Sequence, residues 1–110
     1  MAVLHKDLAA GKWHTLSLAE QLGNVGSEVH RALKWQGKDE KQFSTAVERA
    51  LELFGFTLDD VRWRGRLREI ARAREVFCDA VSGGREYHSS LEDLDRYFFL
   101  FALAARERLI

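Results

Sequence analysis

Residues 95–106 read DRYFFLFALAAR, and this stretch decides which fold the 110-residue chain can adopt. No charged residue occurs from Tyr97 to Ala105, and the whole chain contains no proline. If the stretch is helical, its apolar side chains occupy all sides of the helix. A helix on the surface of a small monomer normally keeps one polar side. The segment therefore predicts a helix that is covered on two opposite sides.

A helical wheel divides this last segment into two apolar groups. One group forms the stripe that a helical bundle buries, and it comprises Leu91, Leu94, Tyr97, Phe98, Phe101, Ala104 and Ala105. The other group lies on the opposite side of the helix, among charged residues, and comprises Phe99, Leu100 and Leu103. A chain of this length forms one core, so the second group needs a different cover.

We expect a second copy of the chain to cover this second group, which makes the protein a homo-oligomer. Burial of three such side chains would contribute roughly 1.5–3 kcal/mol each, and leaving them in water favours association. Arg96 would lie in the polar rim of the subunit contact, and a two-fold contact is its simplest form. A different partner protein is one alternative. The other is that residues 1–16 fold back over the group with Val3, Leu4, Leu8 and Trp13.

Apolar residues at spacings of three and four predict four helices. Their start and end signals lie at Ser17 and Gly37, at Asp39 and Gly55, at Thr57 and Ser82, and at Ser89 or Ser90 and about Leu109. The first start is a capping box, and a staple between Phe56 and Val61 is possible at the third. Short connections favour an all-α, antiparallel four-helix bundle. We expect residues 1–16 to form an N-terminal arm or short extra helix, and residues 17–110 to form the bundle domain.

Composition and charge exclude several classes of protein. The apolar fraction of 46% and the charged fraction of 31% are typical of a folded domain. Seventeen basic residues balance seventeen acidic ones, so no net charge attracts the protein to a nucleic acid or a membrane. The single Cys78 allows no intrachain disulfide, and neither a signal peptide nor a membrane span is evident. We expect a cytoplasmic protein without membrane contact.

Residues 62–74 read RWRGRLREIARAR and raise the possibility of a nucleic-acid partner. On one continuous helix, Arg64, Arg68 and Arg72 would share a face that could contact phosphates. Glu75 and Asp79 continue that face, however. The main interpretation is therefore a solvated surface with ion pairs along the helix.

Arg74 lies within the apolar stripe of the third helix, and a buried guanidinium requires a carboxylate partner. We expect a buried ion pair, with Glu28, Glu48 and Glu52 as candidates. The alternative is that the side chain extends to the edge of the helix.

Gly23 and Gly26 are expected inside the first helix, where each glycine costs about 1 kcal/mol relative to alanine. Close approach of another helix would compensate for this cost, so GNVG predicts a helix crossing. A ligand cleft is the alternative.

The residues that could carry chemistry are scattered along the chain. The four histidines have no metal-binding spacing and Cys78 falls on a buried stripe, so we expect no metal or cofactor. No nucleophile, base and orienting group are evident together, and we expect no enzymatic activity. A small hydrolase or nuclease is the alternative, and it would require a cleft that joins His30 with carboxylates.

Three stretches carry a resemblance: SLAEQLGNVGSEVHRALKW (17–35), FSTAVERALELFGFTLDD (43–60) and REYHSSLEDLDRYFFLFALAAR (85–106). They resemble a family of small, all-helical, uncharacterised bacterial proteins. This resemblance implies a bacterial or archaeal origin and a cytoplasmic location, and it implies no activity. In outline the chain is also similar to the ribosomal intervening-sequence four-helix bundle proteins, which form ring-like homo-oligomers. It lacks the Arg-x4–6-His motif of the helical HEPN ribonucleases.

Overall fold

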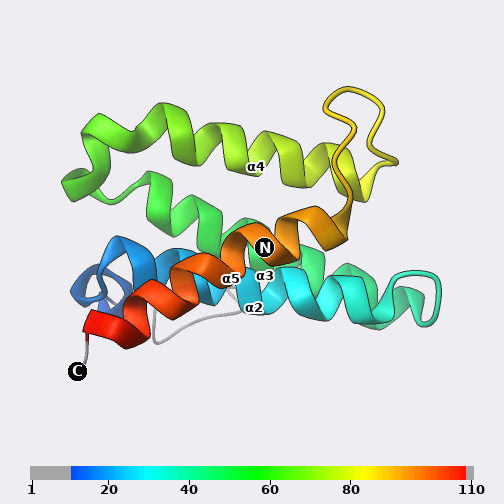
Figure 1. Cartoon of the computed structure of the whole chain (residues 1–110), viewed down its shortest axis with the longest axis horizontal. Helices are drawn as coiled ribbons and strands as arrows, with labels where there is room; N and C mark the ends of the chain where they lie inside the picture. The colour runs from blue at the N-terminus through cyan, green and yellow to red at the C-terminus, as the bar shows by residue number, and fades with distance from the viewer. Residues whose placement is uncertain (1–10, 109–110) are drawn as a thin grey trace.

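The computed structural model describes residues 11–108, and every regular element in that range is a helix (Figure 1). The prediction of an all-helical fold is confirmed. Two short 3-10 helices accompany four long α-helices. The elements are η1 (Lys12–Thr15), α2 (Leu18–Trp35), α3 (Glu40–Leu58), η2 (Val61–Arg66), α4 (Leu67–Val81) and α5 (Leu91–Arg108).

Side-chain caps fix the starts of three of the long helices, α2, α3 and α5. The Ser17 hydroxyl accepts the Glu20 backbone N–H, and the Glu20 carboxylate accepts the Ser17 N–H, so the predicted capping box of α2 is confirmed. Of the two serines considered for α5, Ser90 is the cap, and it exchanges the same pair of bonds with Asp93. Asp39 caps α3 as expected.

The predicted boundary between the second and third helices is wrong. Helix α3 continues through Gly55 to Leu58. Thr57, expected to start the next helix, is fully buried inside α3, where its hydroxyl donates to the Leu53 carbonyl. The extra turn buries Thr57 and lets Phe56 pack on the core. This burial offsets the cost of about 1 kcal/mol for a glycine within a helix.

The predicted third helix is also divided into two. Trp63 has non-helical dihedral angles (φ −102°, ψ 20°) within η2, and α4 begins only at Leu67. Asp60 caps η2 by accepting the Arg62 backbone N–H. Val61 is 67% exposed, so it does not form the staple with Phe56. A single helical wheel therefore does not apply across residues 57–82.

The core lies where α2 packs against both α3 and α5 (Figure 1). Phe54 of α3 is central, because its ring centroid lies 5.9 Å from those of Phe77 in α4 and Phe98 in α5. All three rings are fully buried. Figure 1 shows α5, in orange to red, crossing α2, with α4 along the upper edge of the view.

The described part of the N-terminal segment, residues 11–16, packs on the core. Trp13 is fully buried, its ring centroid lies 6.2 Å from that of Phe56, and its indole N–H donates to the Thr57 hydroxyl at 3.2 Å. Trp13 therefore does not cover the second apolar group of α5. The other residues proposed for that cover, Val3, Leu4 and Leu8, lie outside the described residues.

Candidate functional site

The crossing of α2 and α5 depends on the two predicted glycines. A Cβ atom at Gly26 would lie 2.6 Å from the Phe98 Cβ, and one at Gly23 would lie 3.3 Å from the Ala102 Cα. The first distance is shorter than any normal carbon–carbon contact. The predicted helix crossing at GNVG is therefore confirmed, and it places Phe98 in the core.

A groove of about 700 Å³ runs beside this crossing. Its lining comes from α2 (Gly23, Gly26, Ser27, His30, Arg31) and from α5 (Asp95, Arg96, Phe98, Phe99, Ala102). A polar contact links the two helices here, between His30 Nδ1 and Asp95 Oδ1 at 3.2 Å. The His30 side chain is 66% exposed and that of Asp95 30%, so water screens this pair.

The groove combines a histidine with a carboxylate, which is the arrangement that the hydrolase alternative requires. Its chemistry is incomplete among residues 11–108, because no hydroxyl or thiol there forms a hydrogen bond with His30. The Ser27 hydroxyl donates instead to the Gly23 carbonyl of its own helix, at 3.4 Å. An activated nucleophile needs a base within hydrogen-bonding distance. This geometry orients an imidazole but activates no nucleophile.

The guanidinium groups of the groove are neutralised by neighbours on their own helices. Arg31 lies 3.0 Å from one carboxylate oxygen of Glu28, and Arg96 donates to Asp93 at 2.6 Å. The groove therefore has no excess positive charge with which to attract an anion.

The outward side of α5 is the main apolar surface of the described molecule. Phe99 is 58% exposed, Leu100 63% and Leu103 37%, while Phe98 on the other side of the helix is fully buried. Phe99 also borders the groove, and the exposed Arg96 lies beside it in sequence and in the groove lining. We call the surface formed by Arg96, Phe99, Leu100 and Leu103 the α5 outer face.

The arginines proposed for nucleic-acid contact are only partly brought together. Arg68 and Arg72 line a hollow of about 410 Å³ with Gly65, Arg66 and Glu69, whereas Arg64 lies in η2 and is not part of that lining. The Glu69 carboxylate accepts two bonds from Arg66, at 2.9 and 3.2 Å. Arg72 lies 3.6 Å from Glu75. This pairing along the helix agrees with the solvated-surface interpretation.

The described part of the chain shows no buried ion pair at Arg74, and other arginines pair with the buried carboxylates. Arg74 is half-buried, and no ion pair within residues 11–108 includes it. Two carboxylates are buried among the described residues. Asp60 is 2% exposed and receives two bonds from the Arg62 guanidinium, at 3.0 and 2.7 Å. Glu28 is 5% exposed and pairs with Arg31. Arg74 is only partly buried, so water can hydrate its guanidinium in place of a carboxylate partner.

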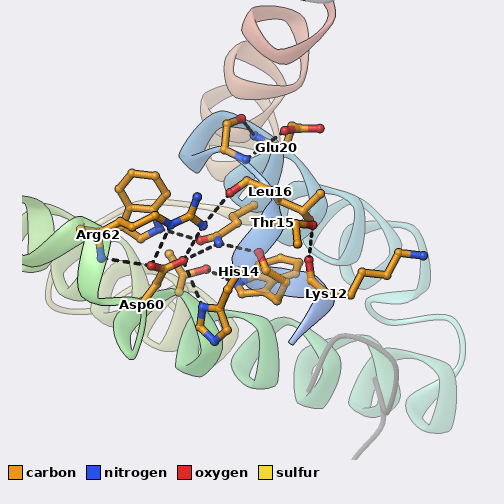
Figure 2. Close-up of polar contacts among 12 residues, drawn as sticks. Lys12, His14, Thr15, Leu16, Glu20, Asp60 and Arg62 are labelled. Atoms are coloured by element: carbon orange, nitrogen blue, oxygen red, sulfur yellow. Dashed lines mark hydrogen bonds and ion pairs between the residues drawn. The ribbon is translucent and has the colours of Figure 1, made fainter. Parts of the chain in front are cut away.

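Asp60 is the centre of a polar cluster that sequence reasoning missed (Figure 2). Besides Arg62, it accepts a bond from Gln21 Nε2 at 3.0 Å, and His14 Nδ1 lies 3.2 Å from its Oδ2 atom. The Arg62 guanidinium is the main cause that holds the pKa of Asp60 far below its ordinary value, while burial opposes this effect. Arg62 also donates to the Leu16 carbonyl at 2.7 Å and so ties the N-terminal segment to η2.

Gln21 connects this cluster to the buried indole of Trp13 and to the partly buried indole of Trp63. Its side chain is fully buried, donates to the Trp13 carbonyl at 2.9 Å and accepts the Trp63 indole N–H at 2.9 Å. The buried side chains of this network, Gln21 and Asp60, have their bonds made within the protein, and such a network holds segments together. We therefore assign the Asp60 cluster to the scaffold. The sequence contained one signal for it, a glutamine among the apolar positions of the first helix.

The described residues contain no group of three or more His, Cys, Asp or Glu side chains that could hold a metal ion. Among the same residues, none of the helices has the length and apolar character needed to cross a bilayer. No protein-family model, curated protein or solved structure matches the chain.

Proposed function

We propose that this protein is a non-enzymatic, self-associating helical module, and that its subunits meet through the α5 outer face. One observation carries the proposal. Three large apolar side chains, Phe99, Leu100 and Leu103, are exposed side by side on a helix whose opposite side already fills the core. Covering them removes apolar surface from water and requires no change in the fold.

The arrangement around this face supports a protein partner over a small ligand. The face lies on the outside of α5, and charged residues flank it, which is the usual anatomy of a subunit contact. The adjacent groove has its arginines paired and its serine hydroxyl engaged, so it offers little to bind a polar substrate. A second copy of the chain is our proposed partner, and a different protein is the alternative.

The proposal also covers the arrangement of the helices, the cellular location and the relationship of the protein to others. The four long helices form an antiparallel bundle, with residues 1–16 as an N-terminal arm. The protein works in the cytoplasm of a bacterium or archaeon. It is related to the uncharacterised family of small helical proteins named above, and its outline similarity to ring-forming four-helix bundles agrees with self-association.

A substitution at Phe99 tests the proposal. We expect the wild-type chain to sediment as an oligomer at tens of micromolar, and the Phe99→Glu variant to sediment as a 12.7 kDa monomer. Val61→Glu is the matched control, because Val61 is 67% exposed and belongs to η2 rather than to the α5 outer face. It should sediment like the wild type. A monomeric wild type, or equal dissociation by both substitutions, would overturn the proposal.

Contact with a nucleic acid is the second candidate, and the hollow beside Arg68 and Arg72 favours it. It predicts that a mixed-sequence RNA or DNA probe binds with an affinity that falls steeply as salt rises. The variant Arg68→Gln/Arg72→Gln should then lose most of this affinity, whereas Arg85→Gln, in the loop after α4, should keep it. Absence of a mobility shift at low salt would dismiss this candidate.

A further inference from the structure

The α5 outer face, together with Glu107 one turn further along the helix, forms a symmetrical pattern of charged and apolar residues. Arg96, Leu100, Leu103 and Glu107 follow one another at spacings of four, three and four residues, so they form one stripe along the helix. All four are exposed. The stripe lies opposite the buried Phe98 and spans roughly 17 Å at 1.5 Å per residue.

Two copies of the stripe are complementary only when their helices run in opposite directions. A point between Phe101 and Ala102 lies midway along it, with a leucine on each side and opposite charges at the two ends. In an antiparallel pair of α5 helices, Leu100 would meet Leu103 of the other copy, and Arg96 would meet Glu107. In a parallel pair, each charge would meet an identical charge, which is unfavourable.

The two end charges are available for such a contact. Glu107 is exposed, and no ion pair within residues 11–108 includes it. The Arg96 side chain is 73% exposed and uses its Nη2 atom to bind Asp93. A guanidinium has five N–H donors, so Arg96 can retain Asp93 and bind a second carboxylate.

From this pattern we infer that the occupant of the α5 outer face is the same face of a second copy, packed antiparallel about a two-fold axis. This inference rests on the proposed function and adds its geometry. The assembly is a closed dimer, because a two-fold contact uses the same surface on both subunits and leaves none for a third. Two Arg96–Glu107 pairs set the register, and Phe99 flanks the leucines on the side of the groove.

Charge reversal at the two ends of the stripe tests this geometry. Arg96→Glu and Glu107→Arg should each weaken dimerisation by about tenfold, because each places like charges together at two symmetrical positions. The double variant Arg96→Glu/Glu107→Arg exchanges the charges, and it should recover wild-type dimerisation to within about threefold. Dissociation constants from sedimentation at low salt are the readout, and circular dichroism verifies the fold of each variant.

The control applies the same charge changes elsewhere. Arg85→Glu/Glu48→Arg changes an exposed loop and the exposed side of α3, and it should leave the dimer unaffected. If the wild type associates but the double variant stays as weak as the single ones, or if the assembly exceeds two chains, the antiparallel geometry is refuted and self-association remains. A wild type that stays monomeric refutes the proposed function itself.

Discussion

A Cβ atom on residue 26 would lie 2.6 Å from the Cβ of Phe98, so Gly26 is the position that allows α5 to lie directly on α2. This contact orients α5 about its own axis. With Phe98 held against α2, the side chains of Leu100 and Leu103 are left on the outside of the molecule. The glycine that places one side of α5 in the core thereby presents the other side to a partner.

Gly26→Ala should destabilise the protein, although alanine is the better helix former. The clash with Phe98 should cost about 1–3 kcal/mol, which exceeds the gain of about 1 kcal/mol in helix propensity. Gly55→Ala is the matched control, because the added Cβ would meet nothing within 4 Å and Gly55 is also within a helix. Thermal or urea unfolding should show a lower stability for Gly26→Ala and an equal or higher one for Gly55→Ala.

Asp60→Asn should reduce the free energy of unfolding by about 2–4 kcal/mol, because it removes the charge that Arg62 binds in a buried site. Arg62 is itself 38% exposed and can be hydrated, which keeps the loss below that for a fully buried pair. Asp59→Asn changes the exposed neighbouring carboxylate, and it should reduce the free energy of unfolding by well under half as much as Asp60→Asn does. Equal losses for the two variants in urea would contradict the central position that we assign to Asp60.

The same carboxylate predicts how stability depends on pH. The pKa of Asp60 is far below its ordinary value in the folded protein, so the folded state holds fewer protons than the unfolded one in acid. Its contribution is complete at neutral pH and is lost progressively as pH falls below about 4. Between pH 5 and pH 2, about the range in which an aspartate protonates, the wild type should lose more stability than Asp60→Asn. If the free energy of unfolding changes with pH in the same way in both proteins, Asp60 is not the source of the acid sensitivity.

The His30–Asp95 contact should matter little to stability. Both side chains are partly open to water, and such pairs contribute about 0.2–1 kcal/mol. His30→Ala should therefore change the free energy of unfolding by less than about 1 kcal/mol. It should also leave the mass of the assembly unchanged, since His30 belongs to α2 and is not one of the residues that form the α5 outer face. A large loss of stability would show that the crossing depends on this pair as well as on Gly26.

The parts of the structure that follow local rules could be predicted from the sequence. Ser17 and Glu20 lie three residues apart, as a capping box requires, and the glycines of GNVG stand where a helix needs a close neighbour. The two-sided character of α5 was likewise visible in its spacing. The capping box is a contact between neighbours in sequence, and the glycines indicate that a helix passes close by without indicating which helix it is.

The parts that depend on contacts distant in sequence could not be predicted. Gly55 resembled the end of a helix, but the helix continues because Thr57 is buried beneath Trp13, 44 residues earlier. Asp60 fell inside the predicted third helix, but it caps η2 instead, and its bond to Gln21 joins positions 39 residues apart. Arg74 was assigned a buried pair because it lies in the apolar stripe of α4, but the stripe alone does not reveal that the side chain stays only partly buried.

The mass of the wild-type protein in solution tests the central claim most directly. Light scattering after gel filtration measures this mass, at concentrations up to about 100 µM so that micromolar dissociation constants are covered. We expect the mass to rise with concentration to twice the chain mass of 12.7 kDa. A constant mass of 12.7 kDa across that range would contradict the claim that the α5 outer face binds a second copy.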